Sequence, residues 1–317
     1  MSGKQGSRRL LRLVLTGLVV GGALAWLGAG LLRQWPLIRA YHWQPHVPLL
    51  ALSLVFAGGW FALRARLWQL ILAGLGCPLP YRAAFRAWAL SELGRFLPGT
   101  VWYVAGRAYL CAECGVAATA SLAGMGMELA LVSVTALAFL AVRATSALAA
   151  LGERLPLLLG VVVLAAAAHP RVLVPLANRV LERLGRPPLP VMPGRTYLGL
   201  LGLSALMWCS LAAGFACFAI GVAGAGSRQA LALASSFPVA WLAGVVVVVS
   251  PGGLGVRETV LAALLTGPLP APLALPVALL SRFWITLPEL ACALLALRLH
   301  LRPPATPPSA VPPLPPS

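Results

Sequence analysis

Residues 91–100 have the sequence SELGRFLPGT, and residues 250–258 have the sequence SPGGLGVRE. Each segment places a proline-glycine break and charged side chains inside a long apolar stretch. Lipid cannot satisfy the backbone N–H and C=O groups that such a break frees, so broken backbone at membrane depth is buried in protein or lines a wet cavity. Ionisable residues at that depth are typical of functional sites. One break near the end of the first third of the chain and another in the last third is the pattern expected of a carrier's substrate site.

The composition is that of a membrane protein. Hydrophobic residues make up 60% of the 317 residues, charged residues make up 10%, and the mean hydropathy is +0.90. Several apolar runs reach the roughly 20 residues that span a bilayer. A net charge of +17 would indicate nucleic-acid binding in a soluble protein. Here the basic residues fall mainly in loops, which positive-inside topology and contact with anionic headgroups explain, so we expect no nucleic-acid partner.

The apolar runs predict an all-α polytopic membrane protein with about six full transmembrane helices and two re-entrant or broken helical hairpins. The expected spans are 10–32, 47–63, 118–141, 151–168, 197–222 and 271–297, and the expected hairpins are 84–112 and 229–267. The run 10–32 is longer than the apolar region of a signal peptide, so we expect a retained anchor helix. Residues 1–302 are expected to form one transmembrane domain, and 303–317 a disordered proline-rich tail.

The basic residues predict the orientation of the chain. With both termini in the cytoplasm, the cytoplasmic segments hold fifteen basic residues and the outer segments hold five. The cytoplasmic set is Lys4, Arg8, Arg9, Arg12, Arg64, Arg66, Arg82, Arg86, Arg171, Arg179, Arg183, Arg186, Arg195, Arg298 and Arg302, and the outer set is Arg33, Arg39, Arg143, Arg154 and Arg228. One full crossing at 84–112 would put the basic loop 169–195 outside. The bias therefore favours a hairpin that enters from the cytoplasm.

Five full spans precede the second hairpin, so with the N-terminus in the cytoplasm this hairpin enters from the outside. Hairpins that enter from opposite sides are what an inverted repeat would give. The only similarity between the two halves at residue level is the shared proline-glycine pair. The loop 169–195 is expected to be a short amphipathic or irregular piece on the inner surface.

The remaining basic residues lie in or near the membrane: Arg95, Arg107, Arg257 and Arg282. Arg95 and Arg107 flank the first break, and a hairpin could bring both guanidinium groups to one cavity. The planar guanidinium donates two parallel hydrogen bonds to a phosphate and stays charged when desolvated. The alternative is that each arginine snorkels to an interface. Residues expected to shape the cavity are Pro98, Gly99, Pro251, Gly252, Gly253 and Gly255.

The carboxylates near these arginines have two interpretations. Glu92 is three residues before Arg95, so the two side chains share a helix face. Glu128 and Glu289 lie deep in apolar spans, where a lone carboxylate is costly, and each is expected to be paired with an arginine or protonated. Proton coupling through either residue is the alternative to structural pairing. Arg282 is seven residues from Glu289, too far for an assumed ion pair.

The sequence gives little support to an enzyme. The chain has no aspartate, its four histidines are scattered, and it has no P-loop, dinucleotide-binding fingerprint or nucleophile elbow. We therefore expect no catalytic residue, metal or cofactor. Cys111 and Cys114 have the spacing of a redox or metal pair, but no second ligand pair accompanies them, and the six cysteines do not indicate a disulfide framework.

Both breaks resemble a known family. The sequence LGRFLPG at 93–99, followed by Tyr103 and Gly106-Arg107, resembles the first signature of the lysylphosphatidylglycerol synthase transmembrane region, also called the flippase-like domain. The sequence SPGGLGVRE at 250–258 resembles its second and more specific signature. The resemblance in order and spacing extends from about residue 10 to 300. Fused bacterial members carry a soluble aminoacyl-transferase domain after this region. The proline-rich tail 303–317 is too short to hold that soluble domain. The resemblance therefore implies a stand-alone, lipid-translocating form of the transmembrane domain here.

The combined hypothesis is a protein of the bacterial inner membrane that binds an anionic lipid between two hairpins and moves it between leaflets. The lipid is expected to be a phospholipid or a polyprenyl-phosphate-linked lipid. Arg95, Arg107 and Arg257 would hold the phosphate, and Glu258 would orient Arg257. The alternative for Arg257 and Glu258 is an ion pair with no substrate role. One alternative is a non-transporting accessory subunit of a glycosyltransferase or cell-envelope glycan pathway. Another is a membrane lipid-modifying enzyme.

Overall fold

The computed structural model describes residues 45–96, 101–147, 169–183, 185–224, 226–246, 255–270 and 273–299, with a few single residues between 29 and 43 and residue 166. The described segments are helical and contain no strand. The predicted spans 10–32 and 151–168 and the tail 303–317 lie outside them, apart from single positions. So do Pro98, Gly99, Pro251, Gly252 and Gly253.

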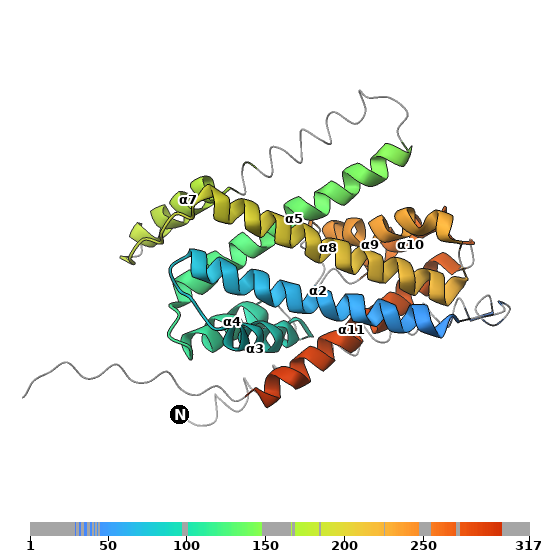
Figure 1. Cartoon of the computed structure of the whole chain (residues 1–317), viewed down its shortest axis with the longest axis horizontal. Helices are drawn as coiled ribbons and strands as arrows, with labels where there is room; N and C mark the ends of the chain where they lie inside the picture. Colours follow the sequence, from blue (N-terminus) through green and yellow to red (C-terminus); the bar gives the residue numbers. More distant parts are fainter. Residues whose placement is uncertain are drawn as a thin grey trace, which may run out of the picture.

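Among the described residues, four helices are long and apolar enough to cross a membrane: α2 (Val47–Gly74), α5 (Ala118–Ala147), α8 (Gly194–Ala223) and α11 (Ala274–Arg298). At about 1.5 Å per residue, each exceeds the roughly 30 Å of a hydrocarbon core. They form the body of the bundle in Figure 1. Their positions agree with the predicted spans 47–63, 118–141, 197–222 and 271–297.

Two pairs of shorter helices lie between the long ones. The first pair is α3 (Tyr81–Glu92) and α4 (Val101–Ala112), joined through the 3₁₀ turn η1 (Leu93–Phe96). The second pair is α9 (Ala230–Val246), preceded by the 3₁₀ turn η2 (Ser227–Gln229), and α10 (Val256–Leu265). The members of each pair pack against each other. The short helices α3, α4 and α10 cannot cross a bilayer alone, as expected for broken hairpins at 84–112 and 229–267.

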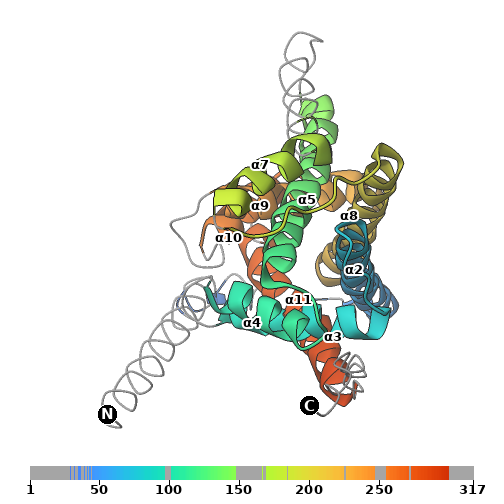
Figure 2. The ribbon, with the colours of Figure 1, turned by 90° about the vertical axis from the view of Figure 1, so that its left-hand side faces the viewer.

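Helices α2 and α8 make the most extensive contact in the bundle and lie side by side in Figures 1 and 2. Small residues on α8 allow this approach: a side chain at Gly214 or Gly221 would press on α2 at Phe56 or Leu49. The Ser210 hydroxyl donates to the Phe56 carbonyl at 2.8 Å. Close backbone approach through small residues is the usual way that membrane helices associate, because lipid is as apolar as the side chains.

Two predicted helix ends are wrong. The helices are longer than predicted, and each therefore includes an arginine that was expected in a loop. Helix α2 continues to Gly74, so Arg64 lies inside it rather than in a cytoplasmic loop, and is buried. Helix α5 continues to Ala147, so Arg143 lies inside it rather than in an outer loop. Arg143 donates to the carbonyls of Ala232 and Leu264. Each helix accommodates its arginine because the guanidinium finds acceptors on neighbouring helices.

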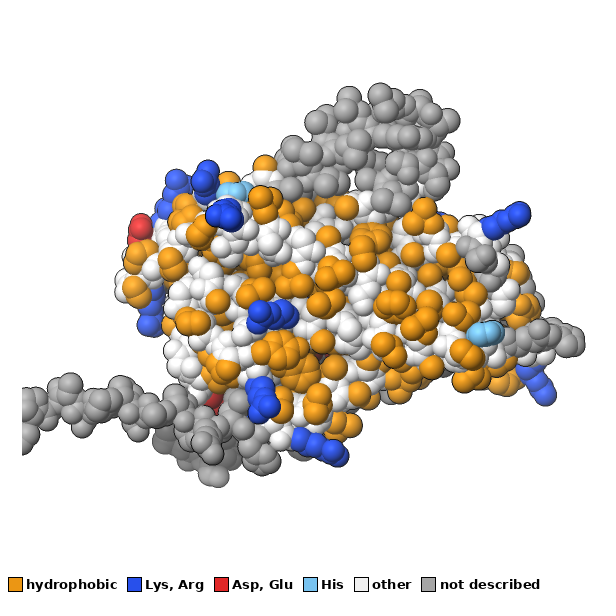
Figure 3. All heavy atoms as spheres, in the orientation of Figure 1, with side chains coloured by type: hydrophobic (Ala, Val, Ile, Leu, Met, Phe, Trp, Pro, Cys, Tyr) orange, Lys and Arg blue, Asp and Glu red, His pale blue; other side chains and the backbone are white. Residues whose placement is uncertain are grey.

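The loop expected at 169–195 contains a helix, α7 (Pro170–Arg183). One face of α7, with Val174 and Leu181, is buried, whereas Val172, Leu176 and Val180 are exposed. Hydrophobic side chains cover much of the surface in Figure 3, and basic side chains gather at its left end, near α7. Further basic side chains lie within the left half of this face and at its right end, and hydrophobic side chains dominate the area between them.

Candidate functional site

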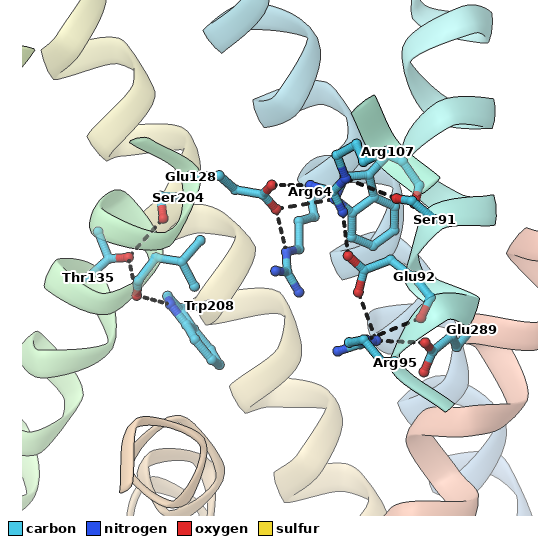
Figure 4. A network of polar contacts seen from close by, with 12 residues as sticks. Arg64, Ser91, Glu92, Arg95, Arg107, Glu128, Thr135, Ser204, Trp208 and Glu289 are labelled. Atoms are coloured by element: carbon cyan, nitrogen blue, oxygen red, sulfur yellow. Dashed lines mark hydrogen bonds and ion pairs between the residues drawn. The ribbon is translucent and has the colours of Figure 1, made fainter. Parts of the chain in front are cut away.

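A chain of alternating charges runs through the bundle interior beside the first hairpin (Figure 4). At one end, Glu128 of α5 accepts a hydrogen bond from Arg64 Nε of α2 at 2.8 Å. Its second oxygen accepts from Arg107 Nη1 of α4 at 2.5 Å, and Trp88 Nε1 donates to the first oxygen at 3.2 Å. Glu128 therefore joins α2, α3, α4 and α5 in one buried contact.

The chain continues through Glu92 and Arg95 to the last long helix. Arg107 Nη2 donates to Glu92 Oε1 at 2.5 Å. Arg95 Nη2 lies 2.8 Å from Glu92 Oε2 and donates to Glu289 Oε1 of α11 at 2.6 Å. The predicted Glu92–Arg95 pair is thus present, and Glu128 and Glu289 are each paired with arginine. Whether either carboxylate also carries protons stays a prediction.

Arg107 is fully buried and already holds protein acceptors. Its Nε donates to Ser91 Oγ at 2.9 Å, and its other two nitrogens donate to Glu92 and Glu128. The guanidinium also lies over the rings of Trp68 and Tyr103, at 4.9 and 4.7 Å from their centroids. In this arrangement Arg107 holds the first hairpin to the bundle, and its predicted contact with a headgroup stays a prediction.

Gly94 explains why the first signature needs glycine beside the charged residues. A Cβ atom at this position would lie 2.7 Å from the Tyr103 backbone nitrogen. Real Cβ atoms do not approach backbone atoms so closely, so only glycine lets η1 pack on α4. This close approach places Arg95, one residue later, next to Glu92 and Glu289.

The second hairpin places Arg257 at the start of α10. Gly255 is the N-cap residue, with φ of +87° that only glycine adopts readily, and its N–H donates to Glu258 Oε2 at 2.8 Å. Arg257 is the second helical residue, and its guanidinium lies 4.3 Å from the ring centroid of Phe237 on α9. Phe237 in turn packs against Phe215 and Trp284. An aromatic cluster from three helices therefore supports one face of the guanidinium.

Arg257 has an unsatisfied hydrogen-bonding edge. Its Nε and Nη2 atoms are buried without a hydrogen-bond partner, and it makes no ion pair with any carboxylate among the described residues. These two nitrogens form the side of the guanidinium that donates two parallel hydrogen bonds to a carboxylate or phosphate. Arg64 and Arg282 each also have one unpartnered buried nitrogen, but both are ion-paired.

Glu258 was expected to orient Arg257, but its partner is Arg282. Glu258 Oε1 accepts from Arg282 Nε of α11, and Oε2 accepts from the backbone of Gly255. Both oxygens are engaged, so Glu258 does not bind Arg257 directly. It ties the start of α10 to α11 and contributes a charge near Arg257. The other charges that act on Arg257 are those of Arg282, Arg95 and Glu289.

The prediction from the sequence did not include Arg64 and Arg282 among the site residues. Arg64 directly follows the predicted span 47–63, which places it in a loop, although no helix-breaking residue occurs between Arg64 and Gly74. A span extended to that glycine would have placed it at membrane depth. Arg282 was recognised as membranous, but its partner Glu258 is 24 positions away. No local spacing rule connects residues on different helices.

All six cysteines are described, and each is a free thiol. Cys111 is buried in the last turn of α4, and Cys114 is partly buried in the turn that follows the helix. Nothing in their surroundings supports the redox alternative, and we assign the pair no chemistry.

This fold and this buried charge network define a polytopic, all-helical membrane protein. A family model for the lysylphosphatidylglycerol synthase transmembrane region matches residues 10–292, and the chain belongs to that family. Comparison with curated proteins and with solved structures gave no significant match.

Proposed function

We propose that the protein binds an anionic lipid at Arg257, between the two broken hairpins, and translocates it between leaflets. The observation that carries the proposal is the unpartnered Nε and Nη2 edge of a buried arginine. An uncompensated guanidinium inside a membrane protein is costly, so a ligand anion that completes its hydrogen bonds is stabilised there. The family match supports a lipid as the source of that anion.

Three features of the surroundings favour a headgroup phosphate. Phe237 fixes the plane of the Arg257 guanidinium, so its two N–H donors are preorganised. The first-turn N–H groups of α10 attract negative charge, because they have no intrahelical acceptor. Arg95, whose side chain is 37% exposed, is the accessible end of the first hairpin's ion-pair chain. Arg95 and Arg257 then act from opposite hairpins on one headgroup.

Inner-membrane location, cytoplasmic termini and the absence of a catalytic step are part of this proposal. The site holds charges that bind and orient an anion. We assign no bond-breaking step to any residue. Arg107, Glu92 and Glu128 hold the first hairpin in place, and Glu258 and Arg282 hold the second.

The test is leaflet exchange in liposomes that contain the purified protein and acyl-labelled phosphatidylglycerol. Dithionite bleaches the label in the outer leaflet, so bleaching beyond that leaflet reports exchange. We expect exchange with the native protein, loss with Arg257→Ala, and a drop with Arg257→Lys. Lysine keeps the charge but loses the two-donor edge, which is worth about 1–3 kcal/mol in binding. Arg228→Lys, at an exposed arginine of η2, is the matched control and should exchange normally.

Exchange by Arg257→Ala at the native rate would overturn the assignment of the site. Lipid binding without exchange by the native protein would overturn translocation and favour a non-transporting role.

A further inference from the structure

We infer that α11 bends at Pro288, and that its terminal segment, residues 289–298, moves when an anion takes the place of Glu289 at Arg95. The inference rests on the proposed function for the source of that anion, a lipid headgroup. It deepens that proposal, because it names a part of the protein that moves during translocation and the contact that controls the movement.

The first step is the interruption of α11 by Pro288. Helix α11 contacts α10 of the second hairpin and α3 of the first, and it extends from one to the other in Figure 1. Pro288 has no N–H, so the carbonyl of Trp284, four residues earlier, lacks its usual helical donor. A helix bends most easily at such a position. Pro288 and Glu289 are both buried, so a bend there moves the interior of the bundle.

The second step is that the part of α11 before the proline is held firmly. The Trp284 Nε1 atom donates to Ser53 Oγ of α2 at 2.9 Å, and the Trp284 ring packs against Phe237 of α9. Arg282 donates to Glu258 of α10. An indole, an aromatic contact and an ion pair therefore fix this part of α11 to three other helices.

The third step is that the terminal segment packs more weakly. Its buried residues are Glu289 and two alanines, Ala293 and Ala296. Alanine buries little apolar area, so these contacts contribute little to the attachment. The large side chains of the segment are exposed, namely Leu290, Leu294, Leu295 and Leu297. The ion pair of Glu289 with Arg95, at 2.6 Å, is therefore a main attachment of this segment to the first hairpin (Figure 4).

Both hairpins are fastened to α5, which contains no proline. Glu128 of α5 binds Arg107 of the first hairpin. Arg143 of α5 donates to the carbonyls of Ala232 and Leu264, one on each helix of the second hairpin. The terminal segment of α11 can move without breaking these contacts, so the hairpins keep their positions while it bends.

The fourth step is competition for Arg95. This arginine contacts Glu289 and Glu92, and its side chain is 37% exposed, so an anion can reach it. An anion at Arg95 repels Glu289, because like charges interact strongly where the effective dielectric constant is low. Glu92 also binds Arg107 and stays with the first hairpin. Glu289 is the partner that leaves, and the terminal segment then turns about Pro288, as in other hinge motions.

The movement is measured as distances between spin labels in phosphatidylcholine nanodiscs with and without phosphatidylglycerol. Cysteines for labelling are introduced in a protein without the six native cysteines. The reporting pair is Val55 and Leu294, and the control pair is Val55 and Phe283, before the proline; all three side chains are exposed. We expect phosphatidylglycerol to shift the first distance and not the second. Glu289→Gln should produce the shift without phosphatidylglycerol, because glutamine has no charge to hold Arg95.

Pro288→Ala tests whether the movement serves translocation. Alanine restores the donor for the Trp284 carbonyl, so the helix resists bending. We expect the variant to bind fluorescent phosphatidylglycerol like the native protein. Its leaflet exchange in liposomes should fall by on the order of tenfold, because a hindered conformational step limits the rate. Pro175→Ala, at the internal proline of α7, is the matched control and should bind and exchange normally.

A distance between Val55 and Leu294 that neither phosphatidylglycerol nor Glu289→Gln changes would overturn the inference. Exchange by Pro288→Ala at the native rate would also overturn it. Either result leaves the anion site at Arg257 standing. Failure of the native protein to exchange lipid would instead overturn translocation, and the distances would still decide whether α11 bends at Pro288.

Discussion

At the scale of single residues, Glu128 and Glu289 differ although both are buried carboxylates paired with arginine. Glu128 accepts from Arg64, Arg107 and Trp88, so its neutralisation leaves Arg64 without a carboxylate partner and Arg107 with Glu92 alone. Glu289 has one arginine partner, Arg95, which also pairs with Glu92. Glu128 therefore stabilises the fold, whereas the Glu289–Arg95 pair can rearrange at smaller cost.

This difference predicts the effect of neutralising Glu128. Glu128→Gln should destabilise the protein by about 3–5 kcal/mol, the usual cost of breaking a buried ion pair by removing one partner. The measurement is the thermal unfolding midpoint in detergent, with Glu113→Gln as control, because an exposed pair contributes about 0–1 kcal/mol. A midpoint for Glu128→Gln equal to that of the control would show that the Glu128 network does not hold the four helices together.

The residues of the site were predictable to different degrees. Arg95 with Glu92 follows from a spacing of three on one helical turn. That Glu128 and Glu289 need arginines follows from their depth in apolar spans. Which arginines serve them does not follow, since Arg107 and Glu128 are 21 positions apart and Arg95 and Glu289 are 194 positions apart. Pairing between helices depends on packing that no local pattern encodes.

At the scale of helices, the order of a long helix, two short helices and a long helix occurs twice. It describes α2, α3, α4 and α5 in the first half, and α8, α9, α10 and α11 in the second. The proline-glycine breaks predicted this order, because proline removes a backbone donor and glycine weakens a helix. The exact ends of α2 and α5 were not predictable, because their terminal arginines look like loop residues. An inverted relation between the halves stays a prediction.

The orientation of the first hairpin has a direct test by cysteine labelling. In a background without the six native cysteines, a single cysteine at residue 185 should label from the cytoplasm, and one at residue 148 from the outside. The expectation follows from the excess of arginine in the cytoplasmic segments. A membrane-impermeant maleimide applied to intact and opened cells distinguishes the two sides. Labelling of residue 185 in intact cells would show that the segment 84–112 crosses the membrane once.

At the scale of the whole molecule, the long helices form a frame that holds two broken hairpins and their charges in one interior. Four of the chain's seven acidic residues belong to this interior. Among the described residues of this interior, the four carboxylates pair with Arg64, Arg95, Arg107 and Arg282, and Arg257 keeps a free hydrogen-bonding edge. The sequence predicts a membrane protein with charges at two breaks. The packing of the helices determines that Arg257 is the arginine without a carboxylate partner among the described residues.

The most direct test of the central claim is a cryo-electron microscopy structure of the protein in nanodiscs that contain phosphatidylglycerol. The account predicts a lipid phosphate whose oxygens lie about 2.7–2.9 Å from Nε and Nη2 of Arg257, the usual length of a charge-assisted hydrogen bond. A structure in which a protein acceptor occupies both nitrogens, and the phosphate density lies elsewhere, would contradict it.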